Sequence, residues 1–125
     1  MPTFTVSVVL QLILALGLLN VWILRSHAAT AYRGGSARTL QEEFAAYGLP
    51  RWAFYLVGAL KVGIAVALLV GLWIPALVVP AAAGLVALMV GAITMHLKVG
   101  DSVLKSLPAL LMLAMSGSLL GFALA

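Results

Sequence analysis

The polar residues of this chain gather in a few short stretches, and long apolar runs separate them. The apolar runs cover about residues 4–24, 52–73, 76–97 and 104–124. About 20 residues, rising about 1.5 Å each, are enough for a helix to cross a hydrocarbon core of about 30 Å. The pattern therefore predicts an all-α integral membrane protein, an antiparallel four-helix bundle in a single domain over residues 1–125.

The longest polar connection, residues 25–51, separates the first two runs. Within it, Thr39 and Glu42 have the spacing of a capping box, in which each side chain accepts a hydrogen bond from the other residue's backbone. Apolar side chains then recur at helical spacing as far as Tyr47, and Gly48 ends the pattern. We predict a short interfacial helix that covers one end of the bundle, with a solvated connecting helix as the alternative.

Composition supports a membrane protein, since 65% of the residues are hydrophobic and only 8% are charged. The mean hydropathy of +1.22 is too high for the surface of a soluble domain. The chain has no cysteine, which excludes disulfides and thiol redox chemistry within it. The lipid bilayer is therefore the first expected partner.

The basic residues give the bundle a predicted orientation. Six of the seven Lys and Arg residues fall on one side of the four predicted spans. They are Arg25, Arg33, Arg38, Arg51, Lys98 and Lys105. By the positive-inside rule that side is cytoplasmic, which places both termini on the non-cytoplasmic side of a bacterial inner membrane. We interpret the net charge of +4 as this signal and expect no nucleic-acid partner.

The seventh basic residue, Lys61, lies near the middle of the second span. A lysine at that depth costs about 2.5 to 3.5 kcal/mol on insertion scales, so it usually faces a bundle interior or a wet cavity. Side chains on a helix lean toward its amino terminus, which brings the Lys61 ammonium toward the depth of Asn20 and His96. We therefore predict a ligand-binding pocket formed by Asn20, Lys61 and His96.

Acidic residues offer a structural alternative for the same lysine. The helix that carries Glu42 and Glu43 would close the pocket, and either carboxylate, or Asp101, could pair with Lys61 as a supporting ion pair. Lys61 could also extend to the membrane rim alone. His96, at a predicted helix end, could be an ordinary interfacial residue. The histidines and carboxylates show no metal-ligand spacing, so no metal site is predicted.

Several local motifs resemble the DoxX-like family of small four-helix membrane proteins over roughly residues 45–113. The most specific ones are Gly48-x-Pro50, Gly58 three residues before Lys61, Gly71-Leu72, and His96-Leu97 near Gly100-Asp101. Relatives include the membrane subunit of a thiosulfate:quinone oxidoreductase and small partners of redox or detoxifying enzymes. Look-alikes often carry a glutamate at the position of Lys61, so the resemblance implies no carboxylate-based mechanism here.

These observations leave two main hypotheses for function, with a third option beside them, and do not decide whether the chain is an enzyme. The first is a redox-associated subunit with a quinone as ligand near Lys61. The second is a non-catalytic accessory or assembly subunit that docks another membrane protein or forms a homo-oligomer, while a carrier for a small anion is a third option. Small residues spaced four apart favour docking. They are Gly63, Ala67 and Gly71, then Ala83, Ala87 and Gly91, then Gly117 and Gly121.

Overall fold

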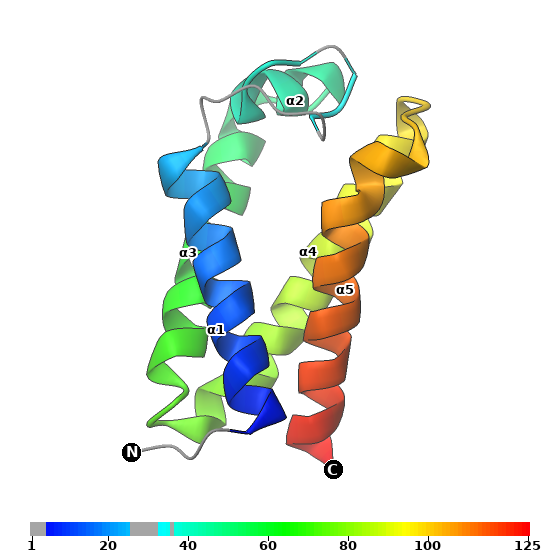
Figure 1. The fold of residues 1–125 in the computed structure, drawn as a ribbon. Coiled ribbons are helices and arrows are strands. Elements are labelled where there is room, and N and C mark those ends of the chain that lie inside the picture. The colour runs from blue at the N-terminus through cyan, green and yellow to red at the C-terminus, as the bar shows by residue number, and fades with distance from the viewer. Residues whose placement is uncertain (1–4, 26–32, 36) are drawn as a thin grey trace.

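The structure is a computed structural model that describes residues 5–25, 33–35 and 37–125 (Figure 1). The predicted start of the first span at residue 4 and the segment 26–32 of the polar connection lie outside the described residues. The elements are α1 (Val6–Leu19), the π-helical turn η1 (Asn20–Leu24), α2 (Leu40–Ala46), α3 (Arg51–Val70), the 3-10 turn η2 (Pro75–Leu77), α4 (Val78–Lys98) and α5 (Val103–Leu124).

The described part of the chain contains four helices that are long and apolar enough to cross a membrane. They run over Val6–Leu24, Arg51–Val70, Pro75–Lys98 and Val103–Leu124. Many of their large apolar side chains point outward, as expected where lipid replaces water around a bundle. The prediction of an all-α membrane bundle with four spans is confirmed.

The long helices pack as two pairs that separate toward one end. Helix α4 packs along α5, and α1 packs along α3, with further contacts of α1 on α5 and of α3 on α4. Both termini lie at one end of the bundle, and α2 lies at the other, where the pairs diverge (Figure 1). The core consists of buried side chains that include Leu14, Leu18, Leu68, Leu85 and Leu119.

A buried amide joins the first pair of helices. The Gln11 side chain is 4% exposed and donates a hydrogen bond of 3.0 Å to the backbone oxygen of Leu68. Gln11 thus joins α1 to α3, whereas Asn20 is exposed at the α2 end of the bundle.

Helix α2 forms as the capping pattern predicts. The Thr39 hydroxyl accepts from the backbone N–H of Glu42, and the Glu42 carboxylate accepts from the backbone N–H of Thr39. Gly48 follows the helix with a φ of 78°, a conformation that glycine adopts without strain. The predicted apolar stripe is buried against the bundle, through Leu40, Phe44 and Tyr47.

The predicted ridges of small residues face two directions. On α3, Gly63 is exposed and Ala67 is half-buried, whereas Gly71 is buried at the helix end with Val78 packed directly against it. The α4 and α5 ridges instead lie on the outer surface of the described bundle. These exposed residues are Ala83, Ala87, Gly91, Gly117 and Gly121.

Gly71 provides a test of the packing at the end of α3. A Cβ atom at this position would lie 2.9 Å from the Ala67 carbonyl oxygen and 3.0 Å from Val78 Cγ2. We expect Gly71→Ala to lower the free energy of unfolding by about 1 to 3 kcal/mol, because the backbone must shift. Thermal unfolding in detergent, followed by circular dichroism, measures the change.

Gly63→Ala on the same helix is the matched control. Apart from the adjacent residues and backbone of its own helix, no heavy atom of the described residues lies within 4 Å of a Cβ built at Gly63. Alanine is also the better helix former by about 1 kcal/mol. This variant should be as stable as the parent protein or more stable. Equal melting temperatures for the two alanine variants would contradict the close approach at Gly71.

Candidate functional site

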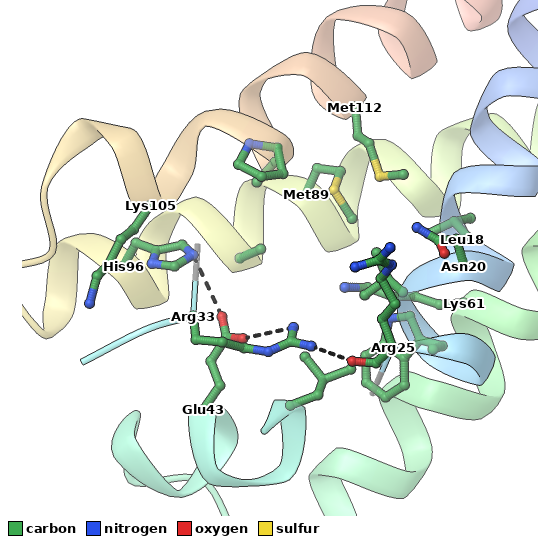
Figure 2. Close-up of a pocket in the computed structure, with 16 residues that line it drawn as sticks. Leu18, Asn20, Arg25, Arg33, Glu43, Lys61, Met89, His96, Lys105 and Met112 are labelled. Atoms are coloured by element: carbon green, nitrogen blue, oxygen red, sulfur yellow. Dashed lines mark hydrogen bonds and ion pairs between the residues drawn. The ribbon is translucent and has the colours of Figure 1, made fainter. Parts of the chain in front are cut away.

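A cavity of about 610 Å³ opens between the two helix pairs at the end covered by α2 (Figure 2). One part of its wall is apolar, with Leu18, Trp22, Met89 and Met112 among the lining residues. The other part is polar and mostly basic. The polar lining residues are Asn20, Arg25, Arg33, Glu43, Lys61, His96 and Lys105.

The structure places all three predicted ligand-binding residues around this one cavity. Asn20 is exposed, Lys61 is partly buried, and His96 is 4% exposed on the opposite wall. Within the described residues, no hydrogen bond joins any two of them. They are therefore three separate polar positions around a shared space.

Lys61 packs against an aromatic wall. Its Nζ atom lies 5.3 Å from the centroid of the Trp22 ring, within the range of a cation–π interaction. The Trp22 ring stacks on Phe54 at 5.4 Å and meets Phe44 edge to face at 5.9 Å. Gly58 makes room for this ring, since a Cβ there would lie 2.8 Å from Trp22 Cζ3. The indole is thus fixed beside the ammonium.

Among the described residues, Lys61 forms no salt bridge with Glu42, Glu43 or Asp101, although the charge of Glu43 acts on it from a longer distance. The Glu42 carboxylate instead accepts hydrogen bonds from the backbone N–H groups of Arg38, at 2.8 Å, and of Thr39. The other two carboxylates lie closer to different partners. Each acid is therefore already engaged by donors nearer than the Lys61 ammonium.

Glu43 joins α2 to the cavity wall. Its Oε1 atom accepts a hydrogen bond of 2.5 Å from the Tyr47 hydroxyl and lies 3.7 Å from His96 Nε2. Its Oε2 atom lies 3.6 Å from Arg33 Nη1, and Arg33 Nη2 donates to the Arg25 backbone oxygen at 2.7 Å. The Glu43 carboxylate is thus enclosed by a phenol, an imidazole and a guanidinium, of which Figure 2 shows the imidazole of His96 and the guanidinium of Arg33.

Asp101 holds the other side of the imidazole, from the connection between α4 and α5. Its Oδ2 atom lies 2.7 Å from His96 Nδ1, and its Oδ1 atom accepts from the Gly35 N–H at 2.9 Å. Lys105 Nζ lies 3.8 Å from Asp101 Oδ1 and donates to the Gly35 carbonyl oxygen. His96 therefore lies between two carboxylates and is not an exposed interfacial residue.

These surroundings shift the pKa values of Asp101 and Tyr47 in opposite directions. Burial alone would raise the pKa of Asp101, but its hydrogen bonds to His96 and Gly35 and the nearby positive charges hold that pKa below its ordinary value. Burial, the hydrogen bond to Glu43 and the charge of that carboxylate raise the pKa of Tyr47. The Tyr47 phenol is consequently a constant hydrogen-bond donor near neutral pH.

Sequence reasoning missed several residues of the site. Arg25, Arg33 and Lys105 had been interpreted only as an orientation signal, and Tyr47 only as part of an apolar stripe. Their place in the cavity depends on the path of the polar connection, which no periodic pattern specifies. Trp22 carried the clearest available signal, because it lies two residues after Asn20 at the end of the same span.

The arrangement offers hydrogen-bond donors beside an apolar space. Lys61, Arg25 and Asn20 can donate to an oxygen atom of a ligand, and the imidazole of His96 can exchange a proton. The described residues include no group of three or more His, Asp or Glu side chains arranged to hold a metal ion. The cavity therefore combines hydrogen-bond donors with apolar side chains in one space.

The chain belongs to the DoxX-like family, whose sequence profile matches residues 9–118. No curated protein and no solved structure shows a significant match to it. The family and the four apolar helices together identify a multi-pass membrane protein. What the cavity binds must be argued from its own residues.

The lowered pKa of Asp101 predicts a specific acid sensitivity. Its carboxylate stabilises the folded state above the ordinary aspartate pKa of 3.8, and this contribution is lost as the pH falls below that value. We expect the melting temperature in detergent to fall on acidification from about pH 5 to about pH 3. Asp101→Asn should be less stable at pH 7 and lose part of this dependence.

Glu42→Gln is the matched control for the Asp101 experiment. Glu42 is exposed and interacts only with the backbone at the start of α2 among the described residues. This variant should keep the acid transition that Asp101 contributes. An unchanged pH profile in Asp101→Asn would show that the aspartate makes no such contribution.

Proposed function

We propose that this DoxX-like protein is a redox-associated subunit of a bacterial inner membrane, and that it binds a quinone-type amphiphile in the cavity beside Lys61. The observation that carries the proposal is the cavity itself, about 610 Å³ in volume, apolar on one side and rich in donors on the other. Pockets for small organic ligands typically have about 300 to 1,000 Å³ and this mixed lining.

Each part of a quinone finds a matching surface. The ring and the first part of an isoprenoid tail would lie against Trp22, Met89 and Met112. The Lys61 ammonium and the Asn20 amide would donate hydrogen bonds to a quinone carbonyl oxygen. The electrons for a change of redox state would be exchanged with the redox enzyme that this subunit accompanies. His96, held between Asp101 and a second carboxylate, would supply or accept the accompanying proton.

The distribution of charge supports an orientation for this subunit. Helix α2 and the cavity lie at the end of the bundle where α3 and α5 begin and α4 ends (Figure 1). The six basic residues outside the middle of a span belong to this end. The positive-inside rule then places α2 and the cavity near the cytoplasmic face and both termini on the opposite face.

Lys61→Met tests the quinone proposal. The substitution keeps an unbranched side chain but removes the donor, so we expect affinity for a short-chain menaquinone analogue to fall about tenfold. Quenching of tryptophan fluorescence in detergent measures binding, and thermal unfolding shows that the variant is folded. Unchanged affinity in a folded variant would leave Lys61 with a structural role only.

Arg38→Gln is the control for this experiment. Arg38 is exposed, does not line the cavity, and uses its backbone N–H for its hydrogen bond to Glu42. Its substitution removes one positive charge from the same end of the bundle. Affinity for the quinone analogue should stay at the level of the parent protein.

A second candidate function, an accessory subunit that docks a larger membrane complex, rests on a different observation. Ala83, Ala87 and Gly91 lie exposed along α4, and Gly117 and Gly121 lie exposed on α5. Small residues four apart allow two helix backbones to approach closely within a bilayer. This role requires no ligand in the cavity, and the docked protein would be another membrane protein or a second copy.

Ala87→Leu tests the docking role. A leucine on this exposed position should leave the bundle folded, because nothing inside the described part of the molecule packs there, but it should block close approach of another helix. We expect a complex isolated in mild detergent to dissociate when sized by light scattering. An unchanged particle mass in the parent protein and the variant, equal to that of one chain, would exclude docking through α4.

A further inference from the structure

More basic than acidic side chains line the cavity, because the full sequence contains few acidic residues. The chain has three acidic residues, which are Glu42, Glu43 and Asp101. All three lie in the described part of the structure, so residues 1–4, 26–32 and 36 contain no carboxylate side chain that could change the balance.

Each acid is already committed to a particular partner. Glu42 caps α2 and does not line the cavity. The Glu43 carboxylate pairs with Arg33 at 3.6 Å. Asp101 lies 3.8 Å from Lys105 across one turn of chain. Two of the four basic residues that line the cavity are therefore balanced by carboxylates of the protein.

Lys61 and Arg25 have no such close acidic partner. Both side chains point into the cavity (Figure 2), and within the described residues neither forms an ion pair. The charge of Glu43 acts on Lys61 only from beyond ion-pair distance, and it is shared with Arg33. Lys61 has the Trp22 ring as its polarisable neighbour, which attracts a cation without neutralising it. Charge held inside an apolar bundle without a close counter-ion is costly, so a ligand that supplies a negative charge gains the most from this site.

From this excess of positive charge we infer that the cavity selects an amphiphile with an anionic head over a neutral one of the same shape. The inference rests on the proposed function in one respect, since it names the acidic members of the quinone class as the preferred ligands. The ionised hydroxyl oxygen of a hydroxyquinone would accept hydrogen bonds from Lys61 Nζ and the Arg25 guanidinium. Its apolar part would lie against Trp22 and Met112.

A matched pair of probes tests the charge preference on the full chain in an uncharged detergent at pH 7. The first is a 2-hydroxy-3-alkyl-1,4-naphthoquinone, which is ionised at this pH. The second is its 2-methoxy ether, a neutral compound with the same ring and tail. Isothermal titration calorimetry should give about tenfold or tighter binding for the acidic probe, as expected for hydrogen bonds to a charged group.

Two substitutions test whether the basic side chains of the cavity cause the preference for the anionic probe. Lys61→Gln keeps a hydrogen-bond donor but removes the charge, so it should bring the affinities of the two probes together. Arg25 lies at the exposed rim of the cavity, so Arg25→Gln tests the contribution of positive charge if Lys61→Gln fails to fold. Arg38→Gln, outside the cavity, should retain the full preference of the parent protein.

The outcomes separate the charge inference from the quinone proposal. Equal affinity for the acidic probe and its ether overturns the charge inference and leaves the quinone proposal intact. If neither naphthoquinone binds, the quinone proposal fails, and lauric acid compared with dodecanol then decides the charge inference. Tighter binding of the fatty acid that Lys61→Gln abolishes would support the inference, whereas equal or absent binding of the two would overturn it.

Discussion

The arrangement of this bundle depends on the need to hold the Lys61 ammonium within an apolar span. Tight packing of all four helices along their whole length would leave that charge no polar surroundings. The structure instead packs the helix pairs closely at the end with the termini and separates them at the α2 end. The lysine lies where they separate, with the Trp22 ring on one side and the cavity on the other. The cavity thus gives this basic residue polar surroundings that a continuous apolar core would lack.

A second set of interactions keeps the separated end together. The carboxylates of Glu43 and Asp101 lie on either side of His96, so that α2 is joined through the imidazole to the connection between α4 and α5. Helix α2 makes its principal helix contacts with α3, so these polar groups attach it to the opposite pair. Buried ionic groups contribute little net stability compared with apolar packing, but removing one partner is costly. This property suits a contact that must specify one position for a short helix.

Much of this fold could be predicted from the sequence, because its strongest patterns are local. Apolar run length gave the four spans, and the capping box at Thr39 gave the start of α2. Depth along the spans also brought Asn20, Lys61 and His96 to one level. The ion-pair partners could not be obtained in this way, since they depend on helix rotation and on the course of the polar connection. Glu43 was therefore named as an acid near the site, while its contacts with Arg33 and Tyr47 came only from the structure.

The closed packing at the end with the termini has a consequence for how any solute uses this protein. Four leucines fill the space between the helices on the side of the cavity that faces the termini. They are Leu14, Leu68, Leu85 and Leu119, and all four side chains are fully buried. In the described conformation these side chains close the bundle between the cavity and the end with the termini. A molecule bound in the cavity therefore has no open path to that end. Transport through the bundle would require these leucines to move apart.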